Sequence, residues 1–417
     1  MLKRQGQLCV AEINKNEVVF LYNIFSYRIS GLQPSAIREI LKFTADPSVI
    51  SFAAGNPAPE AFPVETIRKL SDDILREEPV SALQYSVTEG YTPLRDWLKA
   101  DMKEKGVFKQ GRDELVITSG AQQAIEVITK ILCNESETII CEKPSFVGAL
   151  NAFRSYNAKL VGVDMDDEGI IPEKLDKALK DNPRTAFIYL IPNFQNPTGK
   201  TMSFERRKQI LNIAAIHKVF ILEDNPYGDL RFDGIDIPSL KALDKNSLVI
   251  YVGSFSKILA PGLRVGWLAA PEHIIQKSVV AMQVSTVHTN IWAQMIAYRF
   301  VTTVDFNEHL ENLRYIYKKK YELMIGNLQF RFPNYITFTE PEGGLFIWGT
   351  LPKGSDMMKF CRTAVEHKVA IVPGSAFMPK ESDVTTSFRL NYSTPTDLQI
   401  ENGVEILAKV AKKLYYF

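Results

Sequence analysis

The sequence is poor in cysteine and histidine. Of its 417 residues, four are cysteine and five are histidine. Cys9, Cys133, Cys141 and Cys361 are scattered along the chain, with no CxxC pair and no histidine beside them. This spacing argues against a disulfide framework and against a zinc site, and it is typical of buried thiols in a reducing compartment. We therefore expect a cytoplasmic protein without a bound metal ion.

Excess charge and long apolar runs are also lacking. Forty-nine basic and 48 acidic residues give a formal net charge of +1, which predicts no attraction to nucleic acid or to an anionic membrane. The most apolar N-terminal run, Val18 to Phe25, is too short to span a bilayer, and no signal-peptide cleavage site is evident. The composition, 46% hydrophobic and 23% charged, is that of a globular protein with one large and one smaller domain.

What the sequence has is a regular alternation of strands and helices. Seven short β-branched runs begin at Glu114, Glu137, Ala158, Thr185, Val219, Leu248 and Val265. Amphipathic stretches separate them, among them a predicted helix from Ser203, which can cap it, to Lys218. This alternation predicts an α/β fold with a mainly parallel sheet covered by helices on both faces, in which ligands bind at the carboxyl ends of strands. The last hundred residues predict a small α+β domain.

Unusual residues occur at five of the predicted strands, four of them at or after the end of a strand and one within a strand. Gly120 opens a helix whose first N–H groups can hold a phosphate. Asn196 follows one strand in a turn before proline, Asp224 ends the next, and Lys257 lies beyond a third. Arg389 is embedded in the strand-like run SFRLNYS of the C-terminal part.

Each of these residues alone has an ordinary structural explanation, such as a turn, a capped helix or a solvated side chain. A carboxylate at the end of an apolar strand, however, needs a cation, donors or water around it. Together the residues are the groups that pyridoxal 5′-phosphate requires. A lysine takes its aldehyde, N–H groups, hydroxyls and an arginine take its phosphate, and an aspartate protonates its pyridine nitrogen.

Eight segments carry a resemblance to a known family: PSAIREIL, SFAAGNPAPEAFP, LQYSVTEGYTPLR, TSGAQQAIE, PNFQNPTG, EDNPYGDLRF, GSFSKILAPGLRVGW and EGGLFIW. In this order they resemble the fold-type-I pyridoxal-phosphate aminotransferases of class I/II. Within them the chain is most similar to the branch of kynurenine/α-aminoadipate aminotransferases and bacterial aromatic and 2-aminoadipate aminotransferases.

The resemblance runs from about Ser35 to the C-terminus. It implies an aspartate-aminotransferase-like architecture with a mixed seven-stranded sheet. The implied domains are an unassigned extension (1–30), a segment packing on the small domain and the cleft (31–60), a large cofactor-binding domain (61–305) and a small C-terminal domain (306–417).

The same resemblance implies the catalytic roles. Lys257 would form the internal aldimine and then move a proton between the substrate Cα and the cofactor. Asp224 would keep the pyridine nitrogen protonated, and Asn196 and Tyr227 would donate to the ring oxygen of the cofactor. Arg389 would grip the substrate α-carboxylate with both arms of its guanidinium.

Further contacts are implied for the phosphate, the ring and the substrate. Phe146 matches an aromatic residue that stacks on the ring, where relatives often carry tyrosine. Tyr85 matches a tyrosine donated across a homodimer interface to the partner's phosphate, so each site would need two subunits. The remaining phosphate contacts are Ser254, Ser256, Arg264 and the backbone of Gly120, Ala121 and Gln122, and many relatives have serine at the position of Ala121.

The substrate cleft would be lined by Gly55 and Asn56. Arg38 lies on a mobile N-terminal helix in relatives, where it can meet a distal carboxylate or an aromatic side chain. An exposed arginine on an amphipathic helix is the alternative for Arg38.

We predict a pyridoxal-phosphate-dependent aminotransferase that works by a ping-pong reaction through a pyridoxamine-phosphate form. The donor would be an aromatic, aminoadipate-like or long aliphatic amino acid, and the acceptor a 2-oxoacid such as 2-oxoglutarate. A β-lyase or decarboxylase on the same scaffold is the alternative, because Lys257, Asp224 and Arg389 serve it equally well. A ligand-sensing regulator is a third reading, but the thirty or so preceding residues are too few for a winged helix and show no basic recognition helix.

Overall fold

A computed structural model describes residues 25–30, 32, 46–380 and 382–415 of the chain. All seven predicted runs form strands of one sheet, so the predicted fold class is confirmed. An eighth strand of two residues, which the sequence did not indicate, extends one edge. The strands are β2 (Asp113–Thr118), β3 (Thr138–Lys143), β4 (Lys159–Asp166), β5 (Gly169–Ile170), β6 (Thr185–Leu190), β7 (Phe220–Asp224), β8 (Val249–Ser254) and β9 (Gly266–Pro271).

The order of the strands creates a crevice at one end of the sheet. They lie in the order β2-β9-β8-β7-β6-β3-β4-β5. The five central strands β8, β7, β6, β3 and β4 are parallel, whereas β9 and β5 are antiparallel to their neighbours. The chain moves from β3 outward to β4 and then returns to the other side of β3 with β6. Such a reversal opens a crevice outside the carboxyl ends of the strands, where ligands bind in sheets of this kind.

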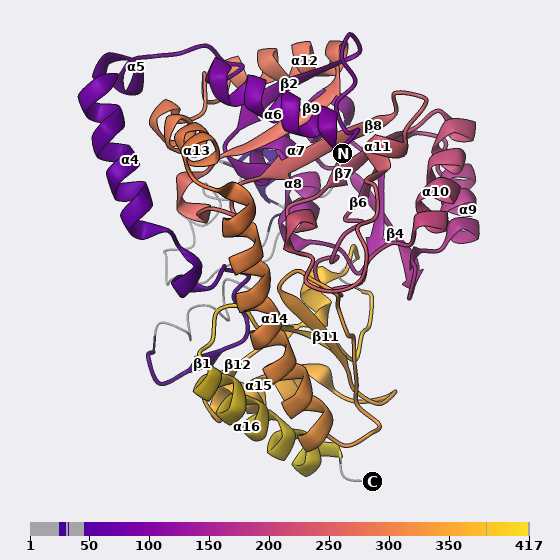
Figure 1. Ribbon diagram of the computed structural model, residues 1–417. Coiled ribbons are helices and arrows are strands. Elements are labelled where there is room, and N and C mark those ends of the chain that lie inside the picture. Colours follow the sequence, from indigo (N-terminus) through magenta and orange to yellow (C-terminus); the bar gives the residue numbers. More distant parts are fainter. Residues whose placement is uncertain (1–24, 31, 33–45, 381, 416–417) are drawn as a thin grey trace, which may run out of the picture.

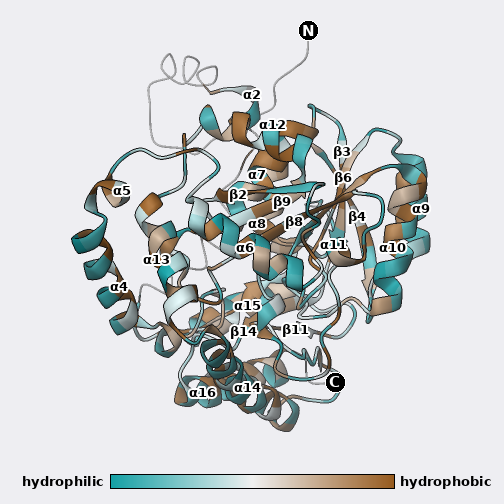
Figure 2. Ribbon diagram, turned by 45° about the horizontal axis from the view of Figure 1, so that its top comes forward, coloured by the Kyte–Doolittle hydropathy of each residue, from teal (hydrophilic) through white to brown (hydrophobic). Residues whose placement is uncertain are grey.

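Helices cover both faces of the sheet because its strands are apolar on both sides. Phe187 and Tyr189 of β6 pack into the core shared with α7 (Gly120–Leu132) and α8 (Val147–Ser155). Ile188 and Leu190 pack into a second core with α9 (Pro172–Asp181), α10 (Phe204–His217) and α11 (Leu240–Leu243). Figure 2 shows the central strands in hydrophobic brown and much of α10 in hydrophilic teal.

The predicted helix at Ser203–Lys218 is confirmed as α10. The Oγ of Ser203 accepts from the backbone N–H of Arg206 at 3.2 Å, which is the contact expected of an N-cap serine. Helices α6 (Thr92–Glu104) and α12 (Glu272–Gln283) pack on β2. Helix α13 (Ile291–Thr303) packs on α6, and α4 (Val64–Glu77) and α5 (Pro79–Leu83) pack on α13 (Figure 1). Among the described residues, no helix is long and apolar enough to cross a bilayer.

The long helix α14 (Phe306–Arg331) leads to the C-terminal part of the molecule, at the bottom of Figure 1. This part contains an antiparallel sheet of β10 (Thr337–Phe338), β11 (Phe346–Thr350), β14 (Ser387–Asn391) and β13 (Val372–Pro373). Helices α15 (Met357–Glu366) and α16 (Asp397–Tyr415) accompany it.

The N-terminal segment joins this C-terminal part, since β1 (Ile50–Ser51) pairs in parallel with β12 (Val369–Ala370). The exact division of the chain at residue 305 stays a prediction. The remaining short helical turns are α2 (Tyr27–Ser30), η1 (Pro59–Ala61), η2 (Gly228–Leu230), η3 (Pro261–Leu263) and η4 (Gly374–Phe377).

Candidate active site

A cavity of about 500 Å³ lies at the carboxyl ends of β6, β7 and β8, where the C-terminal part closes over the sheet. It brings together residues from widely separated stretches of the sequence, from Gly55 to Arg389. The predicted residues that line it are Gly55, Asn56, Ala121, Gln122, Phe146, Asn196, Asp224, Tyr227, Ser254, Ser256, Lys257, Arg264 and Arg389.

Lys257 enters this cavity from the loop after β8. Its Nζ donates to the backbone oxygen of Gly55 at 2.7 Å, and no carboxylate pairs with it among the described residues. Burial, helped by the charges of Arg389 and Arg264, lowers its pKa from 10.5 to about 8. A substantial fraction of this amine is therefore neutral near pH 8, the form in which it can act as a nucleophile or a base.

Asp224 ends β7 and is 2% exposed. Its Oδ2 accepts from the hydroxyl of Tyr189 at 2.7 Å, whereas its Oδ1 is buried without a partner. Burial raises the pKa of Asp224 to about 6, and the hydrogen bond from Tyr189 opposes that rise. An unpaired buried carboxylate oxygen is costly, so Oδ1 is free to receive a proton donor from a ligand in the cavity.

Arg389, on β14, is almost fully buried beside the cavity. Its Nη1 donates to Oδ1 of Asn196 and its Nη2 to the backbone oxygen of Ala53, both at 2.8 Å. Its guanidinium lies over the rings of Phe346 and Phe377, at 4.2 and 4.9 Å from their centroids. The buried Nε has no partner, so this cation keeps donor capacity for an anion.

Asn196 connects this arginine to a buried phenol. Its Nδ2 donates to the hydroxyl of Tyr227 at 3.4 Å, and its Oδ1 accepts from Arg389. Burial raises the pKa of Tyr227 well above its ordinary value, so the hydroxyl stays protonated and can donate. One amide thus joins the two parts of the molecule that enclose the cavity.

The opposite end of the cavity is rich in hydrogen-bond donors. Helix α7 begins at Gly120, whose φ of +71° favours glycine, and a Cβ there would meet the Arg264 guanidinium at 2.5 Å. Arg264 is exposed and donates to the backbone oxygen of Ser119 at 3.0 Å. Ser254 accepts from the N–H of Ser256 at 3.1 Å. The first N–H groups of α7, the hydroxyls and the guanidinium make this end suited to a phosphate.

Not all of the remaining predicted residues lie in the cavity. Phe146 lines the cavity at the start of α8. The backbone oxygen of Asn56 accepts from Ser393 and Thr394. Tyr85 is 82% exposed and lies outside the cavity, against the ring of His288. Arg38 lies outside the described residues.

Sequence reasoning missed three residues that shape the site. The ring of Phe346 lies against the guanidinium of Arg389, and the segment EGGLFIW, which contributes to the family resemblance, predicts no role for it. Tyr189 holds Asp224 from the middle of an apolar strand. Glu142 is 1% exposed at the end of β3, and its position after the apolar run TIIC was the available signal, the same one that singled out Asp224.

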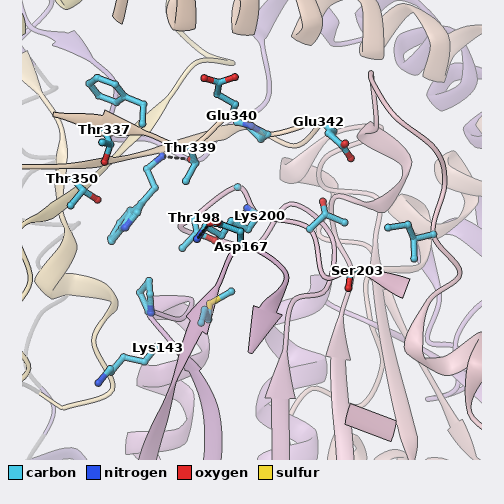
Figure 3. Close-up of a pocket in the computed structure, with 18 residues that line it drawn as sticks. Lys143, Asp167, Thr198, Lys200, Ser203, Thr337, Thr339, Glu340, Glu342 and Thr350 are labelled. Carbon is cyan, nitrogen blue, oxygen red and sulfur yellow. Dashed lines mark hydrogen bonds and ion pairs between the residues drawn. The ribbon is translucent and has the colours of Figure 1, made fainter. Parts of the chain in front are cut away.

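A larger cavity of about 800 Å³ lies on the other side of the loop 195–200 (Figure 3). Two lysines line it, but both are paired. The Nζ of Lys143 lies 2.8 Å from Asp164, and that of Lys200 lies 2.9 Å from Asp167. Because these charges are already matched and solvated, the chemistry belongs to the smaller cavity.

Named proteins resemble the chain over nearly its whole length. It is 39% identical to aromatic-amino-acid aminotransferase 1 of Thermococcus litoralis and 38% identical to the 2-aminoadipate transaminase of Thermus thermophilus. These matches cover 93% and 92% of this chain and 94% and 95% of the relatives. The kynurenine aminotransferase of Pyrococcus horikoshii, solved in complex with PMP, superposes with a TM-score of 0.91 and 37% identity, over 95% of this chain and 99% of that one.

The cavity fits the cofactor of these enzymes, pyridoxal 5′-phosphate. The unpartnered Oδ1 of Asp224 suits a protonated ring nitrogen. The donor-rich end at Gly120 and Arg264 suits a phosphate, and Lys257 lies in the same cavity as both.

The family described as aminotransferase class I and II matches residues 47–407. All the named relatives above catalyse amino-group transfer, and none of them is a lyase or decarboxylase. On the strength of this match, the near full-length relatives and the cavity, the chain belongs to the class I and II aminotransferases and is a pyridoxal-phosphate-dependent enzyme of amino acid transamination.

Proposed function

We propose that the enzyme transfers the amino group of aromatic, aminoadipate-like or long aliphatic amino acids to 2-oxoglutarate. The relatives that act on aromatic amino acids and on 2-aminoadipate support this range. So does the lining of the cavity, where Phe146, Val147, Ile191 and Phe346 offer apolar contacts to a side chain.

We propose the following roles for the chain's own residues, and their places in the cavity support them. The cofactor, when bound, supplies an aldehyde for an amine and a ring that accepts electrons from the substrate. Lys257 holds the cofactor and then carries a proton to and from the substrate Cα, which requires the neutral amine that burial provides. Asp224 holds the ring nitrogen, Asn196 and Tyr227 hold the ring oxygen, and Phe146 stacks on the ring.

We propose that two arginines bind the carboxylates of the substrate, Arg389 the α-carboxylate and Arg38 the distal carboxylate. Within the described residues the cavity is lined by three cations, Lys257, Arg264 and Arg389. We assign Arg264 to the phosphate and Arg389 to the α-carboxylate, which leaves no described cation for the distal carboxylate of 2-oxoglutarate. Arg38 is our candidate for that task, since it matches an arginine that in relatives can meet a distal carboxylate, and a cation that can withdraw from an apolar side chain avoids the cost of an unpaired charge.

We also propose a homodimer with shared active sites. An apolar surface supports it, formed by Val80, Leu83, Tyr85, Val284 and Val287, which are between 48% and 82% exposed. The two segments adjoin, because the N–H of the residue after Tyr85 donates to His288 at 3.3 Å. Exposed apolar patches of this kind mark protein interfaces. Tyr85 would reach the partner's phosphate from this surface.

A panel of amino donors with 2-oxoglutarate as acceptor tests the proposed substrates. We expect turnover with aromatic, aminoadipate-like and long aliphatic donors, and little with alanine or aspartate. Arg38→Ala should weaken 2-oxoglutarate and aminoadipate by about 1–3 kcal/mol in kcat/KM, the scale of one charge-assisted hydrogen bond, and aromatic donors by about 1 kcal/mol or less. Equal losses for both classes would remove Arg38 from substrate selection.

A further inference from the structure

Glu142 is a buried carboxyl group outside the cavity, at the end of β3. Its Oε2 accepts two hydrogen bonds, from the backbone N–H of Ile191 at 3.1 Å and from Nε2 of Gln195 at 3.3 Å. Ile191 lines the cavity directly after β6, and Gln195 immediately precedes Asn196. One oxygen atom therefore fixes both ends of the turn that carries the chain from the sheet to Asn196.

Gln195 organises the loop that follows. Its Oε1 accepts from the backbone N–H and the hydroxyl of Thr198, at 3.0 and 2.7 Å. Its backbone bonds with Lys200 and Gly199 close the loop on itself. Its Nε2 also donates to the backbone oxygen of Pro144 at 2.8 Å. The side chain of Gln195 is thus the link between this closed loop and the end of β3.

The two sides of the loop have different surroundings. Thr198 and Lys200 line the larger cavity, as Figure 3 shows, so the outer side of the loop borders that cavity. On the inner side, Asn196 touches Arg389 and Tyr227. The position of Asn196 then depends on the anchor formed by Glu142 and Gln195.

We propose that Glu142 is a positioning residue for transamination, which sets the place of Asn196 through Gln195 and thereby the contacts of Asn196 with the cofactor ring and with Arg389. The inference rests on the proposed contacts of Asn196. Glu142 does not line the cavity, so it would act through Gln195 and Asn196. Burial raises its pKa to about 8, with a smaller contribution from the nearby Asp224, so the group is mostly neutral at pH 7 and glutamine is its closest substitute.

The test compares the cofactor-loaded wild type with Glu142→Leu and Glu142→Gln. A donor at the ring oxygen lowers the pH at which the visible absorbance of the bound cofactor changes. Glu142→Leu should raise that midpoint by about one pH unit. It should also raise KM for both the amino acid and the 2-oxoacid about tenfold, because Arg389 loses its aligned partner. Glu142→Gln keeps the oxygen that accepts these hydrogen bonds. It should restore the absorbance midpoint of the wild type, and KM to within about twofold.

Glu223→Leu is the matched control. Glu223 is also a buried carboxyl group, on β7, which is separated from β3 by β6. It accepts from the backbone N–H groups of Leu240 and Lys241, away from the cavity. This variant should lose thermal stability with the absorbance midpoint unmoved. If Glu142→Leu behaves in the same way, Glu142 is structural and the proposal is wrong.

Gln195→Met removes the hydrogen bond between Gln195 and Glu142 from the side of the loop. It tests the positioning role if Glu142→Leu does not fold. The same shifts in the midpoint and KM support the proposal, and unchanged values overturn it. The absorbance titration needs no turnover. A wrong assignment of the amino donor would therefore appear in the donor panel and leave the test of Glu142 intact.

Discussion

Two regions of the molecule each bury a carboxylate, an arginine and a lysine, but they differ in how many hydrogen bonds these side chains make. One is the 500 Å³ cavity, and the other lies behind the sheet beside α10 and α11. The cavity holds Asp224, Arg389 and Lys257, and the region behind the sheet holds Glu223, Arg207 and Lys241.

The carboxylates are adjacent on β7, so their side chains point to opposite faces of the sheet. Glu223 accepts from two backbone N–H groups at 2.9 and 2.8 Å, one at each oxygen. Asp224 has one oxygen without a partner. Burial raises the pKa of both.

The arginines and lysines repeat the contrast. Arg207 donates through Nε, Nη1 and Nη2 to four backbone oxygens and to Asn193. The Nε of Arg389 donates to nothing, yet burial lowers the pKa of both arginines to about 10. Lys241 pairs with Asp113 at 2.8 Å, whereas the one hydrogen bond of Lys257 within the described part of the chain goes to the backbone oxygen of Gly55. A shifted pKa therefore does not distinguish the two carboxylates or the two arginines, whereas unused hydrogen-bonding capacity distinguishes the two regions.

The largest expected effect separates the two carboxylates. Asp224→Asn should retain the cofactor and lower kcat about 10³-fold, because an amide cannot keep the ring nitrogen protonated. Glu223→Gln should leave kcat within about twofold and lower the free energy of unfolding by about 1–3 kcal/mol. Steady-state kinetics and denaturant unfolding of both variants measure this. Activity of Asp224→Asn within threefold of the wild type would assign that carboxylate another role.

Substitution of the two arginines should show the same contrast, with a loss of activity at Arg389 and a loss of stability at Arg207. Arg389→Lys replaces a fork by a point charge and should lower kcat/KM about 100-fold with little change in melting temperature. Arg207→Lys should preserve kcat/KM and cost about 3 kcal/mol of stability, since several buried carbonyls lose their donor. A loss of activity in Arg207→Lys equal to that in Arg389→Lys would contradict the contrast.

The smallest effect concerns the lysines and pH. Only a neutral amine adds to an aldehyde, so covalent reconstitution of the apoenzyme should accelerate as pH rises, with a midpoint of about 8. Arg389→Gln removes a nearby positive charge and should move the midpoint upward. Lys241→Met should leave it unchanged while lowering stability. A midpoint near 10.5, the ordinary value, would mean that Lys257 is not desolvated.

The cavity side of this contrast could largely be predicted from the sequence, and the reason is local. Glu223, Arg207 and Lys241 were not predicted. The apolar runs specify the strands, and polar residues at the end of such a run or in the loop after it lie at the same edge of the sheet, which identified Asp224, Asn196 and Lys257. The approach of Arg389 to Asn196 joins residues 193 positions apart, and the sequence suggested it only through the family resemblance.

Other features depend on side-chain direction, which strand patterns do not specify for a sheet buried on both faces. Tyr189 and Leu190 look alike in the sequence, yet only Tyr189 reaches Asp224. Glu142 and Glu223 are both the penultimate residues of apolar strands, and only the three-dimensional structure shows which of them faces the loop of Asn196. The short strand β5 has too few residues to show a pattern.

The most direct test of the central claim is to trap the cofactor on the protein. Borohydride reduction of the yellow holoenzyme followed by peptide mapping should find one cofactor per chain, attached to the peptide that contains Lys257. Attachment to any other lysine, such as Lys143 or Lys200 at the larger cavity, would contradict the assignment of the active site to the smaller one.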